Sequence, residues 1–206
     1  MSGDVLVNLF AAACPALVLT LGFQRAVASM RWSMRGWKLL LVPGALAAVV
    51  LLLPIGGIVV ARWVAAVSAN FSIPFIGTLA VAAWERAFSR RIFSQRDWRT
   101  AWGFGAVGGL ALYPLALGVG SIDPYEWGWR FSPLFVVIGA LTVWLTWKQN
   151  RFGLLLLLAA VAFHLRLLES TNYWDYLLDP VYCMASLVAL GTGLAAKGRG
   201  VAPPDP

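Results

Sequence analysis

The chain has 206 residues, of which 60% are hydrophobic and only 12% are charged, and its mean hydropathy is +0.76. A water-soluble domain of this size could not keep so much apolar area away from water, which excludes an ordinary soluble enzyme or binding module. The formal net charge of +7 does not indicate nucleic-acid binding, because no soluble module is left to carry a basic face.

Apolar runs separated by charged or turn-rich segments fill nearly the whole chain and predict membrane-spanning helices. A helix needs roughly 20 mainly apolar residues to cross the hydrocarbon core. We therefore expect an all-α integral membrane protein, a single polytopic domain over residues 1–206 built as a bundle of about seven transmembrane helices. The predicted spans are 5–24, 39–61, 70–85, 101–120, 131–147, 152–168 and 179–196.

The first span is predicted to be a helix and not a cleaved signal peptide. Asp4 precedes it, Asn8 interrupts its apolar run, and no Lys or Arg comes before Cys14, whereas a signal peptide needs a basic segment followed by a clean apolar one. The two cysteines, Cys14 and Cys183, are too few for a disulfide framework or a thiolate metal site. Both are predicted to be small buried side chains within spans.

Several spans contain helix-breaking residues: Pro15, Pro43, Pro54 with Gly56 and Gly57, Pro74 and Pro114. Near the outer end of span 39–61, the Pro-Ile-Gly-Gly segment 54–57 predicts either a simple kink or an unwound turn that lines a cavity. Span 70–85 is short and contains Pro74. We expect it to cross, because a re-entrant segment would move every later loop to the other side of the membrane and break the charge pattern.

The basic residues gather in alternate connections between the spans. Cytoplasmic loops carry such an excess, so these connections are predicted to be cytoplasmic, with the N-terminus outside and the C-terminus inside. Arg outnumbers Lys by 13 to 3, which is typical of a GC-rich bacterial genome and predicts a location in the bacterial inner membrane. Segments 25–38, 86–100, 148–151 and 197–206 hold thirteen of the sixteen: Arg25, Arg31, Arg35, Lys38, Arg86, Arg90, Arg91, Arg96, Arg99, Lys148, Arg151, Lys197 and Arg199.

Tryptophan positions agree with the same topology, because indole rings prefer the headgroup level to water or hydrocarbon. None of them falls at the middle of a predicted span. Those at the predicted inner interface are Trp32, Trp37, Trp84, Trp98, Trp102, Trp144 and Trp147, and those at the outer interface are Trp63, Trp127, Trp129 and Trp174.

The predicted cytoplasmic segment 84–102 is amphipathic. Trp84, Phe88 and Ile92 recur every four residues with arginines between them, which is typical of a helix at the membrane interface. We expect anionic lipid headgroups to bind at this face, and a partner subunit is the alternative ligand. The candidate headgroup ligands are Arg86, Arg90 and Arg91.

Residues 103–108, Gly-Phe-Gly-Ala-Val-Gly, match the dinucleotide fingerprint GxGxxG literally. That fingerprint binds phosphates only between a strand and a helix of a soluble unit, whereas these residues lie inside a predicted span. Ala101, Gly105 and Gly109 recur every four positions, which lets another helix approach closely. We therefore predict a packing role for this stripe and no cofactor.

The segment 163–180 is dense in ionisable groups on the predicted outer side and contains the one histidine of the chain. Arg166 and Glu169 are spaced to meet on one helix face, and Asp175 and Asp179 share a face if their segment is helical. Asp179 directly before Pro180 is also a helix-start signal. Candidate catalytic residues are His164, Glu169, Asp175 and Asp179, and candidate binding residues of the outer face are Arg62, Asp123, Glu126, Arg130 and Arg166.

Two interpretations of this segment stay open, a capped interfacial loop and a functional site. A hydrolase or transferase needs a nucleophile beside His164, and the sequence places no Ser or Cys there convincingly. Zinc sites need more ligands than one histidine readily supplies, so no metal is predicted. A proton or solute path needs carboxylates deep in the membrane, whereas these lie at one edge.

The sequence thus favours a non-enzymatic accessory or scaffold component of a cell-envelope membrane assembly. Its expected partners are membrane lipids and a protein within the membrane, and no nucleic acid. The first alternative is a membrane enzyme that acts on a lipid or polyprenyl-linked substrate at the outer leaflet, and the second is a small-solute transporter.

Overall fold

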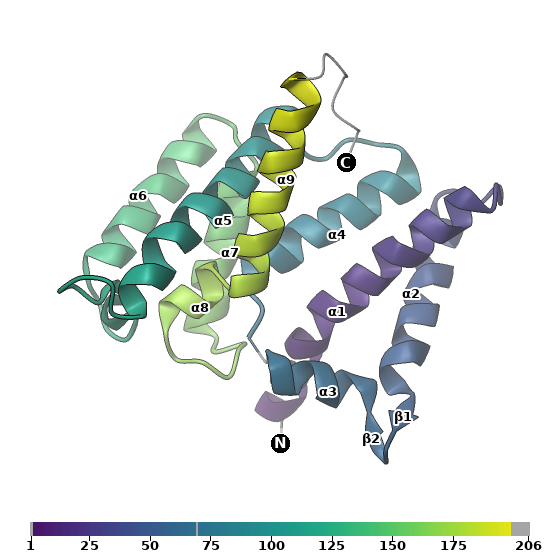
Figure 1. Ribbon diagram of the computed structural model, residues 1–206, viewed down its shortest axis with the longest axis horizontal. Helices are drawn as coiled ribbons and strands as arrows, with labels where there is room; N and C mark the ends of the chain where they lie inside the picture. Colours follow the sequence, from purple (N-terminus) through teal and green to yellow (C-terminus); the bar gives the residue numbers. More distant parts are fainter. Residues whose placement is uncertain (1, 69, 199–206) are drawn as a thin grey trace. The chain divides into compact units, whose positions relative to one another are not determined.

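The computed structural model describes residues 2–68 and 70–198, with side-chain positions within residues 7–68 and 70–193. These residues form nine α-helices, one short 3-10 helix and one hairpin of two-residue strands (Figure 1). The predicted all-α class is confirmed at this level. The signal-peptide prediction used Asp4 and the topology prediction used Lys197 and Arg199, and these three side chains lie outside the described residues.

The chain forms two compact units. The first consists of residues up to Phe71 with Phe75–Ile92 and Leu167–Glu169, and the second of Ser72–Pro74, Phe93–Arg166 and the residues from Ser170 onward. The first unit contains α1 (Ser2–Ser29), α2 (Trp37–Leu52), β1 (Pro54–Ile55), β2 (Ile58–Val59), α3 (Val60–Val67) and most of α4 (Ile73–Phe88). The second contains α5 (Gln95–Ala116), η1 (Pro124–Gly128), α6 (Pro133–Trp147), α7 (Phe152–His164), α8 (Tyr173–Leu177) and α9 (Pro180–Gly198).

In the first unit, α1 packs against α2, and one buried amide ties three helices together. Gln24 of α1 is fully buried and donates from Nε2 to the carbonyl of Leu39 at 3.1 Å and to that of Ala83 at 3.2 Å. These two hydrogen bonds therefore link α1 to the backbones of α2 and α4. Beside them, the ring of Trp37 meets that of Phe88 edge-on at 4.9 Å.

The predicted span 39–61 is wrong in its second half. α2 ends at Leu52, and the chain then turns through β1 and β2, in which Pro54 pairs with Val59. Gly56 and Gly57 have φ values of 62° and 80°, the left-handed values that both central positions of a tight hairpin turn require. Of the two alternatives for residues 54–57, the chain is unwound here and not simply kinked, and these four residues are exposed.

The predicted amphipathic helix over residues 84–102 is also interrupted. α4 ends at Phe88, and α5 begins after Ser94. Ser94 and Asp97 form a reciprocal capping box, in which the Asp97 carboxylate accepts from the Ser94 N–H at 2.8 Å and Ser94 Oγ accepts from the Asp97 N–H at 3.2 Å. This start signal explains the break. Trp84 does stack on Phe88 at 4.2 Å, whereas Ile92 lies in the loop.

The helix α4 begins inside predicted span 70–85, at Ile73, and ends beyond it, at Phe88. Pro74 is its second residue, a position at which the missing N–H of proline would have no helical acceptor. Proline therefore starts this helix and does not break it.

In the second unit, α5 lies beside α9, and α6 lies beside α7 (Figure 1). The contact of α5 with α9 uses the predicted glycine stripe. A Cβ atom on Gly105 would collide with Ser186 Oγ and approach the Tyr182 ring to 3.0 Å, and one on Gly109 would collide with the Cys183 side chain. The packing role predicted for this stripe is confirmed.

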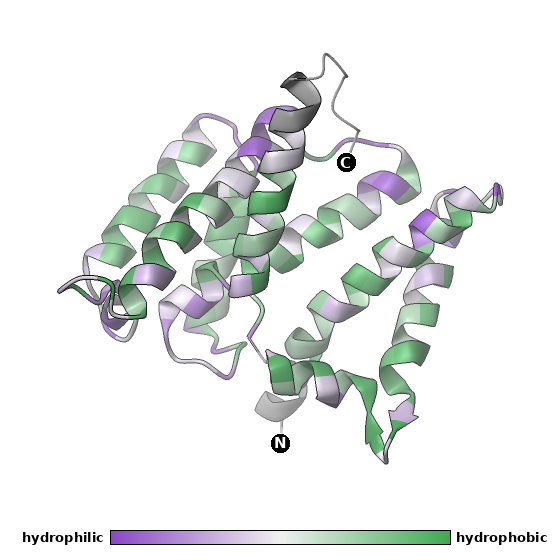
Figure 2. Cartoon of the chain, viewed as in Figure 1, coloured by the Kyte–Doolittle hydropathy of each residue, from purple (hydrophilic) through white to green (hydrophobic). Residues whose placement is uncertain are grey.

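Among the described helices, Val7–Ser29 alone is long and apolar enough to cross a membrane by length and composition. Four shorter apolar helices are Trp37–Leu52, Pro133–Trp147, Phe152–His164 and Pro180–Gly193. Hydrophobic residues cover most of α6 and α7 (Figure 2). The 15 residues of α6 rise about 22 Å at 1.5 Å per residue.

Candidate functional site

Part of the predicted outer-face group does assemble, where η1 meets α8 in the second unit. We call Asp123, Tyr125, Asn172, Trp174 and Asp175 the acid–aromatic cluster. The phenol of Tyr125 lies 3.0 Å from each carboxylate oxygen of Asp175, to which it donates. The indole N–H of Trp174 donates to the carbonyl of Pro124 at 2.8 Å.

Local caps set the backbone of the acid–aromatic cluster. Asp123 accepts from the N–H of Tyr125 at 2.9 Å and starts η1, and Asn172 accepts from the N–H of Trp174 at 2.9 Å and starts α8. The same Asn172 is fully buried and donates from Nδ2 to the Tyr125 carbonyl at 3.0 Å. Gly128 leaves room for it, because a Cβ there would collide with Asn172 Oδ1. The two short helices are thus locked together.

The environment of the cluster keeps its phenol protonated. Burial raises the pKa of Tyr125 above its usual range, and the charge of the neighbouring Asp175 raises it further. Burial also raises the pKa of Tyr173 to about 12. Tyr125 is therefore a hydrogen-bond donor to the Asp175 carboxylate at neutral pH.

Asp179 is only 2% exposed, and its hydrogen bonds are structural. One oxygen accepts from the N–H of Tyr182 at 2.8 Å, which confirms the predicted cap at the start of α9. The other accepts from Ser72 twice, from its N–H at 2.9 Å and from its hydroxyl at 2.6 Å. The Ser72 contact joins residues 107 positions apart, and no local signal in the sequence indicates it.

Two pairings that a continuous helix would have allowed do not share a helix face. α7 ends at His164 and Arg166 has a left-handed φ of 52°, so Arg166 and Glu169 do not share a helix. α8 ends at Leu177, so Asp175 and Asp179 belong to separate elements. In both cases the chain leaves the helix earlier than the apolar pattern indicates.

The remaining outer-face candidates are not drawn into the acid–aromatic cluster. His164, Glu126, Arg130 and Arg166 are exposed in the second unit. Within the described residues, no hydrogen bond joins His164 to Asp175 or Asp179. Two candidates belong to the first unit: Arg62 lies in α3, and the N–H of Glu169 donates to Asn70 Oδ1 at 3.1 Å.

The predicted headgroup ligands of the first unit fall on a helix end and a loop. Arg86 lies in the last turn of α4, whereas Arg90 and Arg91 lie in the loop that follows and are exposed. One terminal nitrogen of Arg86 is buried without a hydrogen-bond partner among the described residues. Both cysteines, Cys14 and Cys183, are buried thiols, as predicted.

No three His, Cys, Asp or Glu side chains within the described residues come together in a way that could hold a metal ion. In the acid–aromatic cluster, the Asp175 carboxylate is instead bound by the Tyr125 phenol and the Asp123 carboxylate caps η1. The geometry of this region is that of capped and interlocked helix ends.

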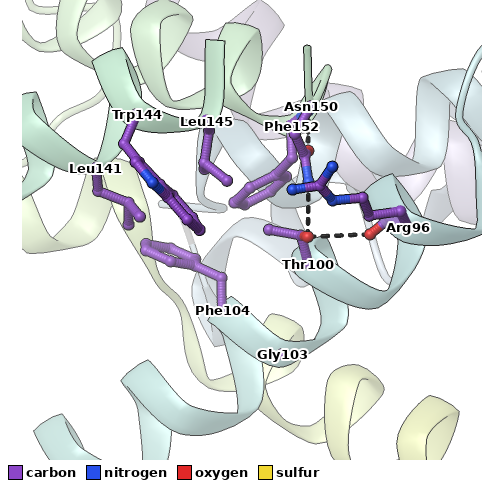
Figure 3. Close-up of a pocket in the computed structure, with 9 residues that line it drawn as sticks. All are labelled: Arg96, Thr100, Gly103, Phe104, Leu141, Trp144, Leu145, Asn150 and Phe152. Atoms are coloured by element: carbon purple, nitrogen blue, oxygen red, sulfur yellow. Dashed lines mark hydrogen bonds between the residues drawn. The ribbon is translucent and has the colours of Figure 1, made fainter. Parts of the chain in front are cut away.

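Sequence reasoning missed a pocket at the other end of the second unit, between the start of α5, the end of α6 and the start of α7 (Figure 3). Its volume is about 330 Å³. On α5, the four-residue spacing of Arg96, Thr100 and Phe104 is a signal that could have revealed one wall. The lining residues are Arg96, Thr100, Gly103, Phe104, Leu141, Trp144, Leu145, Asn150 and Phe152.

Comparison with known proteins gives no relative: no family model, no curated protein and no solved structure matches this chain.

Proposed function

We propose that this chain is a multi-pass membrane protein of the bacterial inner membrane that acts as a non-enzymatic scaffold or accessory subunit of an envelope assembly. About seven crossings, with the N-terminus outside and the C-terminus in the cytoplasm, account for the alternation of basic segments. The structure supports membrane insertion of one helix by length and composition, Val7–Ser29. The multi-pass arrangement is our inference from the surfaces of the other helices.

The surfaces of α6 and α9 carry apolar side chains that would face water in a soluble protein. Val136 and Val143 of α6 are 59% and 70% exposed, and Met184 and Val188 of α9 are 68% and 65% exposed. Continuous apolar faces of this kind mark contact with lipid or with another protein. The helices are short for a bilayer, but local thinning and flanking interfacial residues let a short apolar helix cross at modest cost.

The observation that carries the scaffold role is that the buried carboxylates of the second unit already serve the fold. Asp97 and Asp179 are 3% and 2% exposed, and each caps a helix and accepts a second hydrogen bond from a distant segment. Asp175 accepts from Tyr125. An enzyme at the outer face would need Asp175 or Asp179 for proton transfer, whereas a scaffold needs them only to hold its shape.

Photo-crosslinking in intact membranes tests the scaffold role. A photoreactive residue replaces Val136, Val143 or Met184 on the outward faces, with buried Leu145 of α6 as the matched control position. We expect one defined protein adduct from an outward position and none from position 145. A protein that yields no such adduct, and that purifies alone in mild detergent, would rule out the accessory role.

Membrane insertion is tested separately by extraction of membranes at alkaline pH, which removes peripheral proteins. We expect the chain to stay with the lipid fraction.

In the photo-crosslinking experiment, His164→Ala and Asp175→Asn are expected to leave the protein adducts unchanged. Loss of the adducts in both variants, with normal amounts of protein, would favour the enzyme alternative at the outer face.

A further inference from the structure

The pocket between α5, α6 and α7 has one polar end and one apolar end. Arg96, Thr100 and Asn150 form the polar end, and the apolar walls include Phe104 and Trp144 (Figure 3). Its volume of about 330 Å³ is at the lower end of the range of roughly 300–1,000 Å³ found for small-molecule sites. A pocket of this form fits a ligand with a charged head and an apolar chain, of which only a part enters.

The polar end is ordered by hydrogen bonds that leave one cationic donor available. Asn150, which is 2% exposed, donates from Nδ2 to Thr100 Oγ1 at 2.7 Å, and that hydroxyl donates to the Arg96 carbonyl at 2.9 Å. Within the described residues, nothing forms a hydrogen bond or an ion pair with the guanidinium of Arg96. Its fork of N–H groups matches a phosphate.

The charge at this end of the unit favours an anion. The start of α5 and the turn from α6 to α7 carry the cations Arg96, Arg99, Lys148 and Arg151 against one carboxylate, Asp97. That carboxylate is already engaged, because it accepts from the N–H of Ser94 at 2.8 Å and from that of Arg151 at 3.1 Å. Four cations against one carboxylate leave this end of the unit with an excess of positive charge, which favours an incoming phosphate.

The apolar end provides a wall for a hydrocarbon chain. The rings of Phe104 and Phe152 lie 5.4 Å apart, and Trp144 is 48% exposed. Gly103 leaves its part of the pocket lining open, because a Cβ atom there would find no other atom within 4 Å. Methylene groups can thus contact aromatic faces without displacing any side chain.

We propose that this pocket binds an anionic phospholipid of the cytoplasmic leaflet, with the phosphate on Arg96 and the first part of one acyl chain against Phe104 and Trp144. The inference rests on the proposed membrane function, in which this end of α5, α6 and α7 lies at the cytoplasmic interface. Anionic lipids give that leaflet its negative surface potential.

Native mass spectrometry of the full chain in detergent tests the proposal, with dioleoyl phosphatidylglycerol, dioleoyl phosphatidylcholine and glycerol 3-phosphate as probes. Arg96→Gln removes the phosphate ligand, and Gly103→Leu adds a side chain to the pocket lining at a position where a Cβ atom meets no other atom within 4 Å. Arg99→Gln is the matched control, because it removes the same charge from the same helix at a residue outside the pocket lining.

We expect phosphatidylglycerol to bind in preference to phosphatidylcholine and to glycerol 3-phosphate. Arg96→Gln and Gly103→Leu should each weaken phosphatidylglycerol binding about tenfold, whereas Arg99→Gln should change it less than about twofold. Arg96→Lys should restore part of the loss. Equal effects of Arg96→Gln and Arg99→Gln, full binding by Gly103→Leu, or equal binding of glycerol 3-phosphate would each overturn the pocket assignment.

The two proposals fail in different ways. A chain released from membranes at alkaline pH defeats both the membrane function and the lipid pocket. A chain that stays in the membrane but shows any of the three overturning results defeats the pocket alone.

Discussion

At the scale of single residues, Asp179 shows how a carboxylate that suggests chemistry in the sequence can serve the fold. It accepts from the Tyr182 N–H as a helix cap and from Ser72 through two hydrogen bonds. The cap can be predicted from the sequence, because Asp followed by Pro is a local signal at a helix start. The bonds to Ser72 are not, because they depend on tertiary folding.

The variant Asp179→Asn should lower the free energy of unfolding by about 2 kcal/mol. The amide replaces one acceptor oxygen with a donor, so a buried N–H or O–H loses its partner. Thermal unfolding in detergent measures the effect. Asp123→Asn is the control, because Asp123 is exposed, accepts one N–H bond, and asparagine is an equally good cap. Equal losses in both variants would contradict the role assigned to burial.

The hydrogen bond from Tyr125 to Asp175 makes a prediction about alkaline pH. The pKa of Tyr125 is raised in the folded chain, so its contribution to stability is complete below the ordinary tyrosine pKa of about 10 and declines as the pH rises toward the folded value. We expect the wild type to be more stable than Tyr125→Phe at pH 7 and the gap to narrow above about pH 10. Denaturation series from pH 7 to 11 measure it. A gap that widens with pH would show that the phenol ionises more readily in the folded chain.

At the scale of elements, the glycines of α5 separate a packing role from helix propensity. Gly105 and Gly103 lie on the same helix, but a Cβ atom meets Ser186 and Tyr182 at the first position and open space at the second. The four-residue spacing revealed this stripe in the sequence. Its partner on α9 was not readable, because no pattern on α9 specifies α5 over another helix.

We expect Gly105→Ala to destabilise the chain by about 1–3 kcal/mol through overpacking. Gly103→Ala should be neutral or stabilising by up to about 1 kcal/mol, since alanine favours a helix more than glycine does. Thermal unfolding of the two variants side by side tests this. Similar shifts for both would mean that α5 and α9 do not pack as closely as the glycine contacts indicate.

Helix ends were the least predictable feature of the elements, for a physical reason. Apolar content continues past the end of α2, yet Gly56 and Gly57 adopt left-handed backbone that suits a hairpin. Past α7, Arg166 takes a left-handed φ although it is not a glycine. The first end had a glycine signal, which fitted either a kink or an unwound turn within a span, whereas the second had none.

At the scale of the whole molecule, polar side chains gather at two separate places in the second unit. In the second unit, the acid–aromatic cluster lies where η1 meets α8, and the lipid pocket lies where α6 turns into α7. The sequence anticipated carboxylates at one side and basic residues at the other from charge alone. The pocket escaped prediction because its polar end joins residues 50 positions apart, Thr100 and Asn150.

The proposed crossings assign these two ends to opposite sides of the membrane. The loop before α5 and the turn from α6 to α7 are then cytoplasmic, and η1 and α8 are outside. In this arrangement, the exposed apolar faces of α6 and α9 would lie between these two levels, where lipid or a partner could cover them.

The most direct test of the proposed topology is the location of reporters fused after residues 95, 124 and 171. The proposed topology predicts a cytoplasmic signal after residue 95 and outside signals after residues 124 and 171. A cytoplasmic signal after residue 124 or 171 would contradict the proposed crossings, and at 171 it would also overturn the outward placement of His164 and Asp179.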